Sequence, residues 1–280
     1  MPQFDSAAGD TLAAKAARFR QMHEGPRILV LPNAWDAGTA RVFEAAGFPA
    51  LATTSAGIAY AAGHPDGEGI GREEMLEAVR RIAAAVRIPV TADMESGYGD
   101  SVAAAEATAQ GVLSAGAIGL NIEDSRGGRL LDIGDQSARV RAIRRVAAEA
   151  GIQLVINART DVYLRQAGPP ETRFDDAVRR ANAYREAGAD CLFIPGVRDA
   201  ATIGKLAGAI HGPINILAVA GTPAVSELQR LGVARVSTGS GPMRAALTLV
   251  RRIAEELQRG TYASFSENTI SHADMNTLME

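Results

Sequence analysis

Short apolar runs alternate with longer amphipathic segments along most of the chain. From residue 28 onward eight apolar runs occur, at residues 28–32, 49–54, 88–93, 117–123, 152–158, 190–195, 213–219 and 233–237. Between them lie segments such as REEMLEAVRRIAAAVR (72–87), in which apolar residues recur at spacings of three and four, as they do in amphipathic helices. This regular alternation predicts parallel strands that are joined by helices.

Eight strand–helix units of roughly 25 to 35 residues are typical of one closed (β/α)8 barrel of the TIM type, a fold of about 250 residues. We expect a single domain over residues 1–280, with the barrel core at about 28–259. An extra helix at residues 11–23 is predicted before the barrel and a tail from Thr261 after it, and both are available for assembly. A doubly wound open sheet is the alternative, although no GxGxxG or P-loop fingerprint follows an early strand.

Polar residues recur on one face of four neighbouring predicted strands, because alternate side chains of a strand face opposite sides. The residues that share this face, or follow it at the strand end, are Thr53, Ser55, Thr91, Asp93, Glu95, Asn121, Glu123, Asn157 and Arg159. They lie at or near the carboxyl ends of the strands, which is where barrels of this type carry their active sites.

Several acids should meet at this end of the barrel. Asp93, Glu95 and Glu123 are expected within a few ångströms of one another, with Asp66 and Asp124 on nearby loops. Crowded carboxylates must take up protons or hold a cation. Because the ligands are hard oxygens without His or Cys, the pattern favours Mg²⁺ or Mn²⁺ over zinc or iron, with open positions for two adjacent substrate oxygens.

A structural role for these acids is the alternative. Acids at strand ends also cap neighbouring helices or pair with surface arginines, and for Asp93 alone that explanation serves equally well. The set formed by Asp93, Glu95, Glu123 and Arg159 on three successive strands favours the metal site.

Composition narrows the class of partner. The chain has 280 residues, 47% apolar and 22% charged, with a formal net charge of −3 and scattered Lys and Arg, so we expect neither nucleic acid nor a membrane as partner. Residues 1–10 lack the pattern of a secretory signal, and residues 45–65 are too weakly apolar for a transmembrane helix. The single cysteine, Cys191, excludes a disulfide framework and fits a soluble, cytoplasmic protein.

Four segments together resemble a known family. TTSAGIAYAAGHPD (53–66), TADMESGYG (91–99), NIEDS (121–125) and NARTD (157–161) occur in the order and at the spacing of the isocitrate lyase/phosphoenolpyruvate mutase superfamily. The resemblance covers the barrel from about residue 29 to residue 249.

The resemblance implies a Mg²⁺-dependent enzyme that acts on a 2-oxo or 2-hydroxy (di)carboxylate through an enolate-like intermediate. It implies that Asp93 holds the metal, with Glu95 and Glu123 acting directly or through its waters. A divalent ion and an arginine suit this chemistry, because both stabilise negative charge as it develops on the substrate oxygen. Members of the superfamily usually form tetramers, often by exchanging the last barrel helix, so a homotetramer or dimer is expected.

Substrate contacts are implied in the same way. By resemblance, the backbone around Thr53, Thr54 and Ser55 takes the substrate carboxylate, Asp66 lies beside it, and Arg159 pairs with the substrate oxygens.

The loop after the fourth strand departs from the superfamily. It reads DSRGGRLLDIGDQ (124–136) and has neither the Lys-x-Cys-Gly-His segment of the lyases nor the lysine and Asn-Ser pair of the mutases and phosphonate hydrolases. A histidine that follows the sixth strand in the mutases and phosphonate hydrolases is also replaced, near Pro195. We therefore expect a carbon–carbon lyase or decarboxylase with an unusual substrate. The alternatives are a mutase or hydrolase of the phosphonate or phosphoenolpyruvate type, and a barrel that binds metal and dicarboxylate without catalysis.

Four further positions are open to interpretation. Tyr98 lies between two glycines, where its hydroxyl either stabilises a developing oxyanion or packs over the rim, and with Arg159 and Glu123 it completes the expected catalytic set. His64 is either an acid or base or an exposed loop residue. Cys191 is expected to be a small buried side chain without a catalytic role. Arginines of the loop, such as Arg126, either bind a second carboxylate or are solvated.

Overall fold

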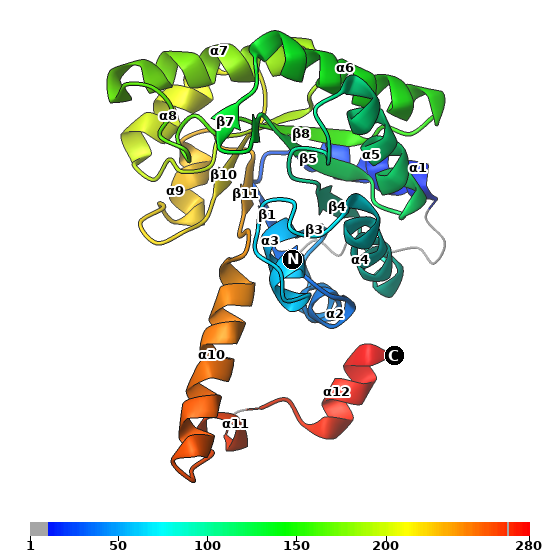
Figure 1. Ribbon diagram of the computed structural model, residues 1–280, viewed down its shortest axis with the longest axis vertical. Helices are drawn as coiled ribbons and strands as arrows, with labels where there is room; N and C mark the ends of the chain where they lie inside the picture. The colour runs from blue at the N-terminus through cyan, green and yellow to red at the C-terminus, as the bar shows by residue number, and fades with distance from the viewer. Residues whose placement is uncertain (1–10, 268) are drawn as a thin grey trace.

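A computed structural model describes residues 11–267 and 269–280 (Figure 1). The prediction about a secretory signal in residues 1–10 lies outside the described residues.

Parallel strands form a closed barrel in the described part of the chain. The strands are β1 (Leu29–Leu31), β2 (Asn33–Ala34), β3 (Leu51–Thr53), β4 (Val90–Asp93), β5 (Gly119–Glu123), β8 (Val155–Arg159), β9 (Cys191–Phe193), β10 (Ile214–Leu217) and β11 (Arg235–Ser237). Their order is β1-β11-β10-β9-β8-β5-β4-β3-β2. The sheet closes on itself because β1 pairs with β11 while β2, which follows β1 in the same segment, pairs with β3. The predicted barrel is confirmed, and each predicted run contains one of its strands.

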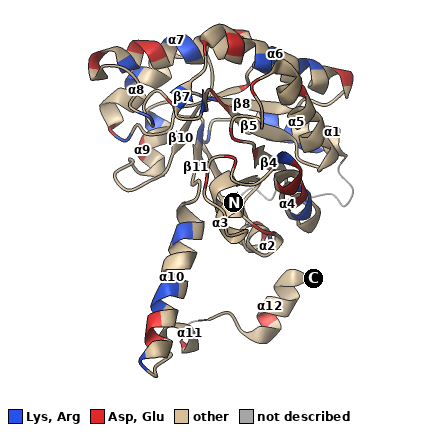
Figure 2. Ribbon diagram, in the orientation of Figure 1, with Lys and Arg blue, Asp and Glu red and all other residues tan. Residues whose placement is uncertain are grey.

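Helices surround the barrel (Figure 1). They are α2 (Ala37–Ala45), α3 (Ser55–Ala61), α4 (Arg72–Ala85), α5 (Val102–Ser114), α6 (Ile133–Glu149), the 3-10 helix η1 (Pro170–Thr172), α7 (Arg173–Glu186), α8 (Ala200–Ala209) and α9 (Val225–Arg230). Figure 2 shows basic and acidic residues mixed along these outer helices. Among the described residues, no helix is both long and apolar enough to cross a lipid bilayer.

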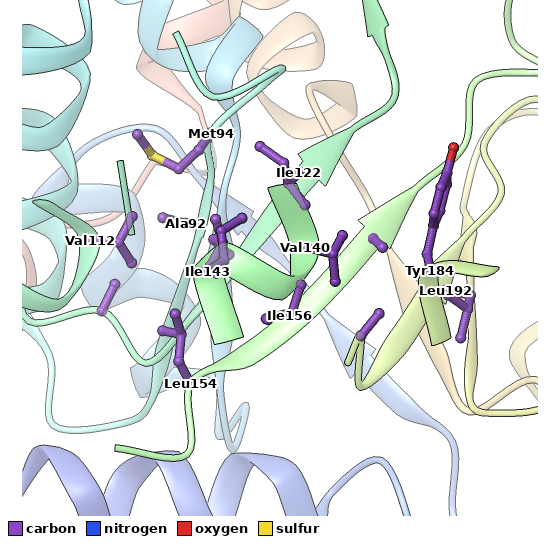
Figure 3. Packing of buried hydrophobic residues seen from close by; sticks show 14 of the residues in the cluster. Ala92, Met94, Val112, Ile122, Val140, Ile143, Leu154, Ile156, Tyr184 and Leu192 are labelled. Carbon is purple, nitrogen blue, oxygen red and sulfur yellow. The ribbon is translucent and has the colours of Figure 1, made fainter. Parts of the chain in front are cut away.

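The main core lies between the strands and the outer helices. Figure 3 shows Val140 and Ile143 of α6 packed toward Ile122 of β5 and Ile156 of β8, and all four are fully buried. Val140 and Ile143 are three residues apart, so the 3.6-residue period places both on the face of α6 that meets the sheet. The apolar positions that predicted the helices are therefore the ones that attach them to the barrel.

A second core fills the amino-terminal end of the barrel. The helix α1 (Leu12–Gln21) buries Ala16 and Phe19 completely, against Leu29 and Leu31 of β1 and Val155 at the start of β8. The predicted extra helix is confirmed, and it covers the end of the barrel opposite the carboxyl ends of the strands.

The last long helix leaves the barrel. In Figure 1, α10 (Gly241–Gln258) projects away from the strands and leads to α11 (Ala263–Ser266) and α12 (His272–Met279), which contacts α2. Met243 is the one buried residue of α10, whereas Val250 and Leu257 are more than half exposed. A helix that follows the last strand would normally cover the barrel wall, so this apolar surface is left uncovered.

Two local features differ from the predictions. The strand β4 ends at Asp93, and Glu95 adopts φ of +50° in the following turn, so the alternation of side chains does not extend to Glu95. The loop after β5 forms a small antiparallel hairpin of β6 (Ser125–Arg126) and β7 (Arg129–Leu130). Gly127 and Gly128 form its turn with positive φ, a conformation that favours glycine.

Candidate active site

A cavity of about 190 Å³ opens at the carboxyl ends of the strands. It is lined by Asn33, Thr54, Ser55, Ala56, Asp66, Asp93, Asn121, Arg159, Leu164, Phe193, Pro195, Leu217, Ser237, Gly239 and Ser240. The expected substrate-binding residues Thr54, Ser55, Asp66 and Arg159, together with Asp93, are thus brought around one space.

Asp93 is held in place by the start of α3 on one side and by β5 on the other. Its Oδ2 accepts hydrogen bonds from the Ser55 backbone N–H at 3.1 Å and from Ser55 Oγ at 2.8 Å. Its Oδ1 lies 3.3 Å from Asn121 Nδ2, and Asn121 Oδ1 in turn accepts from Asn157 Nδ2 at 2.7 Å. The strand register explains this chain of contacts, because Asp93 pairs with Asn121 and Asn121 with Asn157.

Arg159 is fixed between two acids. Its Nη1 lies 2.7 Å from Glu123 Oε2, and its Nε lies 2.6 Å from Oδ1 of the fully buried Asp161. The guanidinium also stands over the Phe193 ring, with Cζ 5.8 Å from the ring centroid. Because these contacts remove most of its freedom, Arg159 presents its charge to the cavity in one orientation.

The turn after β4 forms a second group of contacts. Glu95 Oε2 accepts a hydrogen bond from the backbone N–H of Glu68, and the Tyr98 hydroxyl lies 3.4 Å from Glu95 Oε1. Glu68 Oε1 accepts from the Tyr98 backbone N–H at 2.9 Å. Glu68, which follows Asp66 in the loop before α4, therefore ties that loop to the turn that carries Glu95.

Burial and neighbouring negative charge raise the pKa of three carboxyl groups of the site. Burial, followed by the charge of Asp93, raises the pKa of Glu95 to about 7. Burial also raises the pKa of Glu123, although Arg159 opposes the shift. The pKa of Asp66 is raised by burial of its carboxyl group and then by Asp93, even though the residue as a whole is exposed. A charge of opposite sign would relieve this repulsion.

The donor chemistry fits a divalent cation held mainly by one carboxylate. Within residues 11–267 and 269–280, no three acidic, histidine or cysteine side chains lie close enough together to form a metal-binding cluster. Asp93, Glu95 and Glu123 therefore do not converge as a ready three-carboxylate shell, because Glu95 faces the loop of Glu68 and Glu123 faces Arg159. Mg²⁺ nevertheless suits such a site, since it keeps several waters and often takes only one or two carboxylates.

Several other predicted residues lie beside the cavity without lining it. Thr53 is fully buried, and its hydroxyl accepts from the backbone N–H of Asp93 at 2.9 Å. Tyr98 contacts Glu95 rather than the cavity wall. Asp124 was expected near the acids, but its Oδ2 accepts from Tyr184 Oη at 2.8 Å on the side of α7. Cys191 is completely buried, which raises its pKa to about 12.

Sequence reasoning missed part of the cavity wall. Asn33 joins two strand ends, because its Oδ1 accepts from the Gly239 N–H at 2.9 Å and its Nδ2 donates to the Thr53 carbonyl at 2.7 Å. Phe193 and Leu217 stand at the ends of β9 and β10 and form apolar wall. The alternation that places Asp93 on the inner face also places these two residues there, but apolar residues at strand ends do not differ in sequence from ordinary core residues.

The barrel interior beneath the site contains a buried arginine. Arg235 of β11 has no exposed surface, and burial lowers its pKa to about 10. Its Nη2 lies 3.5 Å from Asn121 Oδ1, while its Nε and Nη1 have no hydrogen-bond partner in the described residues. Asn121, which contacts both Asp93 and Asn157, therefore also lies next to a buried positive charge.

Known proteins are similar to this chain in sequence and in fold. The family model of phosphoenolpyruvate phosphomutase matches residues 19–258. An uncharacterised protein of Mycobacterium tuberculosis is 36% identical over 243 residues, which cover 86% of this chain and 89% of the relative. An oxaloacetate decarboxylase of Bradyrhizobium diazoefficiens is 30% identical over 257 residues, which cover 88% and 86%. A crystal structure from Burkholderia cenocepacia J2315, described only provisionally as a lyase/mutase, matches with a TM-score of 0.89 and 37% identity over 95% of both chains.

Proposed function

The chain belongs to the phosphoenolpyruvate phosphomutase family within the isocitrate lyase/phosphoenolpyruvate mutase superfamily, and we propose that it is a Mg²⁺-dependent lyase or decarboxylase. Its substrate is a small 2-oxo or 2-hydroxy carboxylate, and the reaction cleaves a carbon–carbon bond through an enolate-like intermediate. One observation carries the proposal: Asp93, held by Ser55 and Asn121, faces a cavity in which Arg159 supplies the positive charge. Among the relatives reported above, the one with a named reaction is the oxaloacetate decarboxylase.

Asp93 is the residue that would hold the metal, while Glu95 and Glu123 contribute through bound water. When bound, Mg²⁺ or Mn²⁺ acts as a Lewis acid that stabilises negative charge on the 2-oxo oxygen. Ser55 and Asn121 direct the Asp93 carboxylate by three hydrogen bonds, so little reorganisation is needed on binding.

Arg159 stabilises the charge that develops on the substrate oxygens. The contacts with Glu123 and Asp161 keep its guanidinium at the cavity wall, so the stabilisation is preorganised. Glu123 and Tyr98 are proposed as further catalytic residues, with the Tyr98 hydroxyl reaching the site through Glu95. Burial raises the pKa of Tyr98, which keeps the hydroxyl protonated and available as a hydrogen-bond donor.

The substrate carboxylate is proposed to lie beside Thr54 and Ser55, at the start of α3. Both residues line the cavity, and Asp66 borders it from the loop that follows α3. Thr53 would act indirectly, since its hydroxyl accepts from the backbone of Asp93.

We propose that the protein assembles as a homotetramer or dimer through α10. The apolar residues Leu247, Val250 and Leu257 of this helix are exposed, and α10 projects from the barrel (Figure 1). Exchange of α10 between two copies would cover this surface, in the way that members of the superfamily often assemble.

The proposed activity is tested with purified protein, Mg²⁺ and a panel of 2-oxo and 2-hydroxy acids, including oxaloacetate and methylisocitrate. Release of CO₂, pyruvate or glyoxylate that is lost in Arg159→Lys and on removal of metal supports it. Release of phosphate from phosphonopyruvate would instead assign the mutase or hydrolase chemistry. Metal-dependent binding of these acids without turnover would indicate that the protein binds them without catalysing a reaction.

A further inference from the structure

The cavity has two chemically different halves. Ser55, Asp93 and Arg159 form a polar half at the ends of β3, β4 and β8. Leu164, Phe193, Pro195 and Leu217 form an apolar half at the ends of β8, β9 and β10. A substrate that places its carboxylate against the polar half can extend its remaining substituent along the apolar residues, with Ser237 and Ser240 on the neighbouring wall.

Two glycines pack closely against residues of the apolar half, one against the backbone of Leu164 and one against the side chain of Leu217. A Cβ on Gly196 would stand 2.7 Å from the backbone nitrogen of Leu164, so this glycine allows the loop of Leu164 to pack closely over β9. A Cβ on Gly239 would stand 3.0 Å from Cδ1 of Leu217. Both glycines have positive φ, so each position combines a close approach with a backbone conformation that other residues resist. The chain segments that carry Leu164 and Leu217 are therefore closely packed, and the apolar half forms a defined wall of the cavity.

Part of the apolar half is accessible to a ligand. Leu164 is 45% exposed at the mouth of the cavity, whereas Phe193 is buried with its ring under the guanidinium of Arg159. An alkyl group that covers Leu164 and the edge of this wall removes apolar surface from water, which favours binding.

The described residues that line the cavity offer little positive charge for a second carboxylate. Arg159 is the one cationic side chain among the described residues that line the cavity. The neighbouring Arg126 pairs with Glu68 and Asp100, and Arg165 pairs with Asp161. Arg126, for which binding of a second carboxylate was one of two interpretations, therefore already has two acidic partners.

The charge of the lining also matches a single carboxylate. Asp66 and Asp93 are its acidic members, and the guanidinium of Arg159 is already paired with Glu123 and Asp161. A divalent cation would therefore be the main positive charge open to the substrate. A single carboxylate can reach that cation, while a second would lie unpaired against Phe193 and Leu217, at a high desolvation cost.

We propose that the substrate is a monocarboxylate, a 2-oxo or 2-hydroxy acid whose other end is an apolar alkyl group seated against Leu164, Phe193 and Leu217. This inference rests on the proposed function, because the metal and Arg159 fix which end of the substrate faces the polar half.

Two acids of equal length test the inference. The Mn²⁺-loaded protein is titrated calorimetrically with oxalate, pyruvate, 2-oxopentanoate and 2-oxoglutarate, under conditions in which none is turned over. We expect each buried methylene to improve affinity roughly fourfold, so 2-oxopentanoate, which has two more methylenes, should bind about 15-fold more tightly than pyruvate. 2-Oxoglutarate, which differs from 2-oxopentanoate by a terminal carboxylate in place of a methyl group, should bind at least about tenfold more weakly than 2-oxopentanoate.

Substitution of the exposed Leu164 gives the reciprocal test. Leu164→Arg should strengthen the binding of 2-oxoglutarate, weaken that of 2-oxopentanoate and leave that of oxalate unchanged. Val225→Arg, at a similarly exposed site on α9, is the matched control and should leave all three affinities unchanged.

The outcomes separate this inference from the proposed function. If oxalate binds with Mn²⁺ but 2-oxoglutarate binds as tightly as 2-oxopentanoate, the apolar end is refuted and the metal site stands. If oxalate does not bind in the presence of Mn²⁺, the proposed metal site fails and the inference falls with it. Tighter binding of 2-oxopentanoate, reversed by Leu164→Arg, supports the inference.

Discussion

At the level of single residues, Arg159 is the cation that offsets the buried negative charge of the site. Its guanidinium lies between Glu123 and the fully buried Asp161, so its loss removes the cation that contacts both buried acids. Removal of one member of a buried ion pair typically costs far more than removal of an exposed one.

Arg159→Met should lower the free energy of unfolding by about 3–5 kcal/mol, because Glu123 and Asp161 stay buried and lose the cation that contacts both of them. Arg126→Met is the matched control, since the pairs of Arg126 with Glu68 and Asp100 are partly exposed and should cost only about 0–1 kcal/mol. Urea denaturation measures both. An equal loss in the two variants would contradict the role given to Arg159.

His23 makes the stability depend on pH. It is buried against Phe19, its Nδ1 lies 2.9 Å from the Phe19 carbonyl, and burial lowers its pKa to about 3. A histidine in the unfolded chain takes up a proton near its ordinary pKa of about 6.5, whereas the folded protein resists that proton. The neutral side chain therefore favours folding above that pH, and stability falls as the pH drops from about 6.5 toward 3.

His23→Gln should remove this part of the pH dependence. Between pH 7.5 and pH 5 the wild type should lose about 2 kcal/mol of unfolding free energy that the variant keeps. The exposed His211 provides the control, and His211→Gln should retain the wild-type slope. Chemical denaturation across this pH range decides the matter, and parallel curves for His23→Gln and wild type would refute the assignment.

At the scale of elements, the turn after β4 sets the position of Glu95. Gly97 has φ of +88°, and a Cβ there would stand 2.8 Å from Ile122 Cδ1 and 2.9 Å from Arg139 Nη2. Gly47, at the end of α2, has a similar φ of +85°, but a Cβ there would meet no atom within 4 Å. Alanine at Gly47 would therefore add only backbone strain, whereas alanine at Gly97 would add both backbone strain and a steric clash.

Gly47→Ala should cost about 1 kcal/mol of unfolding free energy, because alanine resists the left-handed conformation. Gly97→Ala should cost about 1–3 kcal/mol more, because overpacking adds to that strain. It should also weaken divalent-ion binding, since Glu95 moves with the turn. Thermal unfolding compares the pair, and equal losses would show that the turn tolerates the added methyl group.

The elements show where sequence reasoning succeeds and where it stops. Alternation along the strands correctly placed Asp93, Asn121 and Arg159 on one face, because a parallel register brings strand ends together. It failed beyond the strand end at Glu95, where positive φ redirects the chain. Turn chemistry of the kind formed by Gly127 and Gly128 leaves no periodic signal, so the hairpin of β6 and β7 was not predicted.

At the scale of the whole molecule, α10 carries an apolar surface that the barrel does not cover. Val250 is 57% exposed and Leu257 is 54% exposed. The alternating pattern predicted a helix after the last strand, but the same amphipathic pattern arises whether the apolar face packs on its own barrel or on a second copy. The position of α10 in Figure 1 favours the second copy.

Val250→Glu combined with Leu257→Glu should convert the assembly to monomers of 29.2 kDa without unfolding them, because both side chains are exposed in the single chain. Arg252→Glu, on the opposite face of α10, should leave the assembly intact. Light scattering coupled to size-exclusion chromatography gives the masses. A wild-type protein that is itself monomeric would contradict assembly through α10.

The proposed lyase or decarboxylase chemistry depends on a divalent cation bound by Asp93. Isothermal titration of the full-length protein with Mn²⁺, with oxalate present, measures this directly. The wild type should bind Mn²⁺, and Asp93→Asn should weaken binding by at least about 100-fold, since even indirect metal contacts are worth roughly 10- to 100-fold. Asp36→Asn, which alters only the cap of α2, should bind as the wild type does. Absence of Mn²⁺ binding by the wild type, or undiminished binding by Asp93→Asn, would contradict the account.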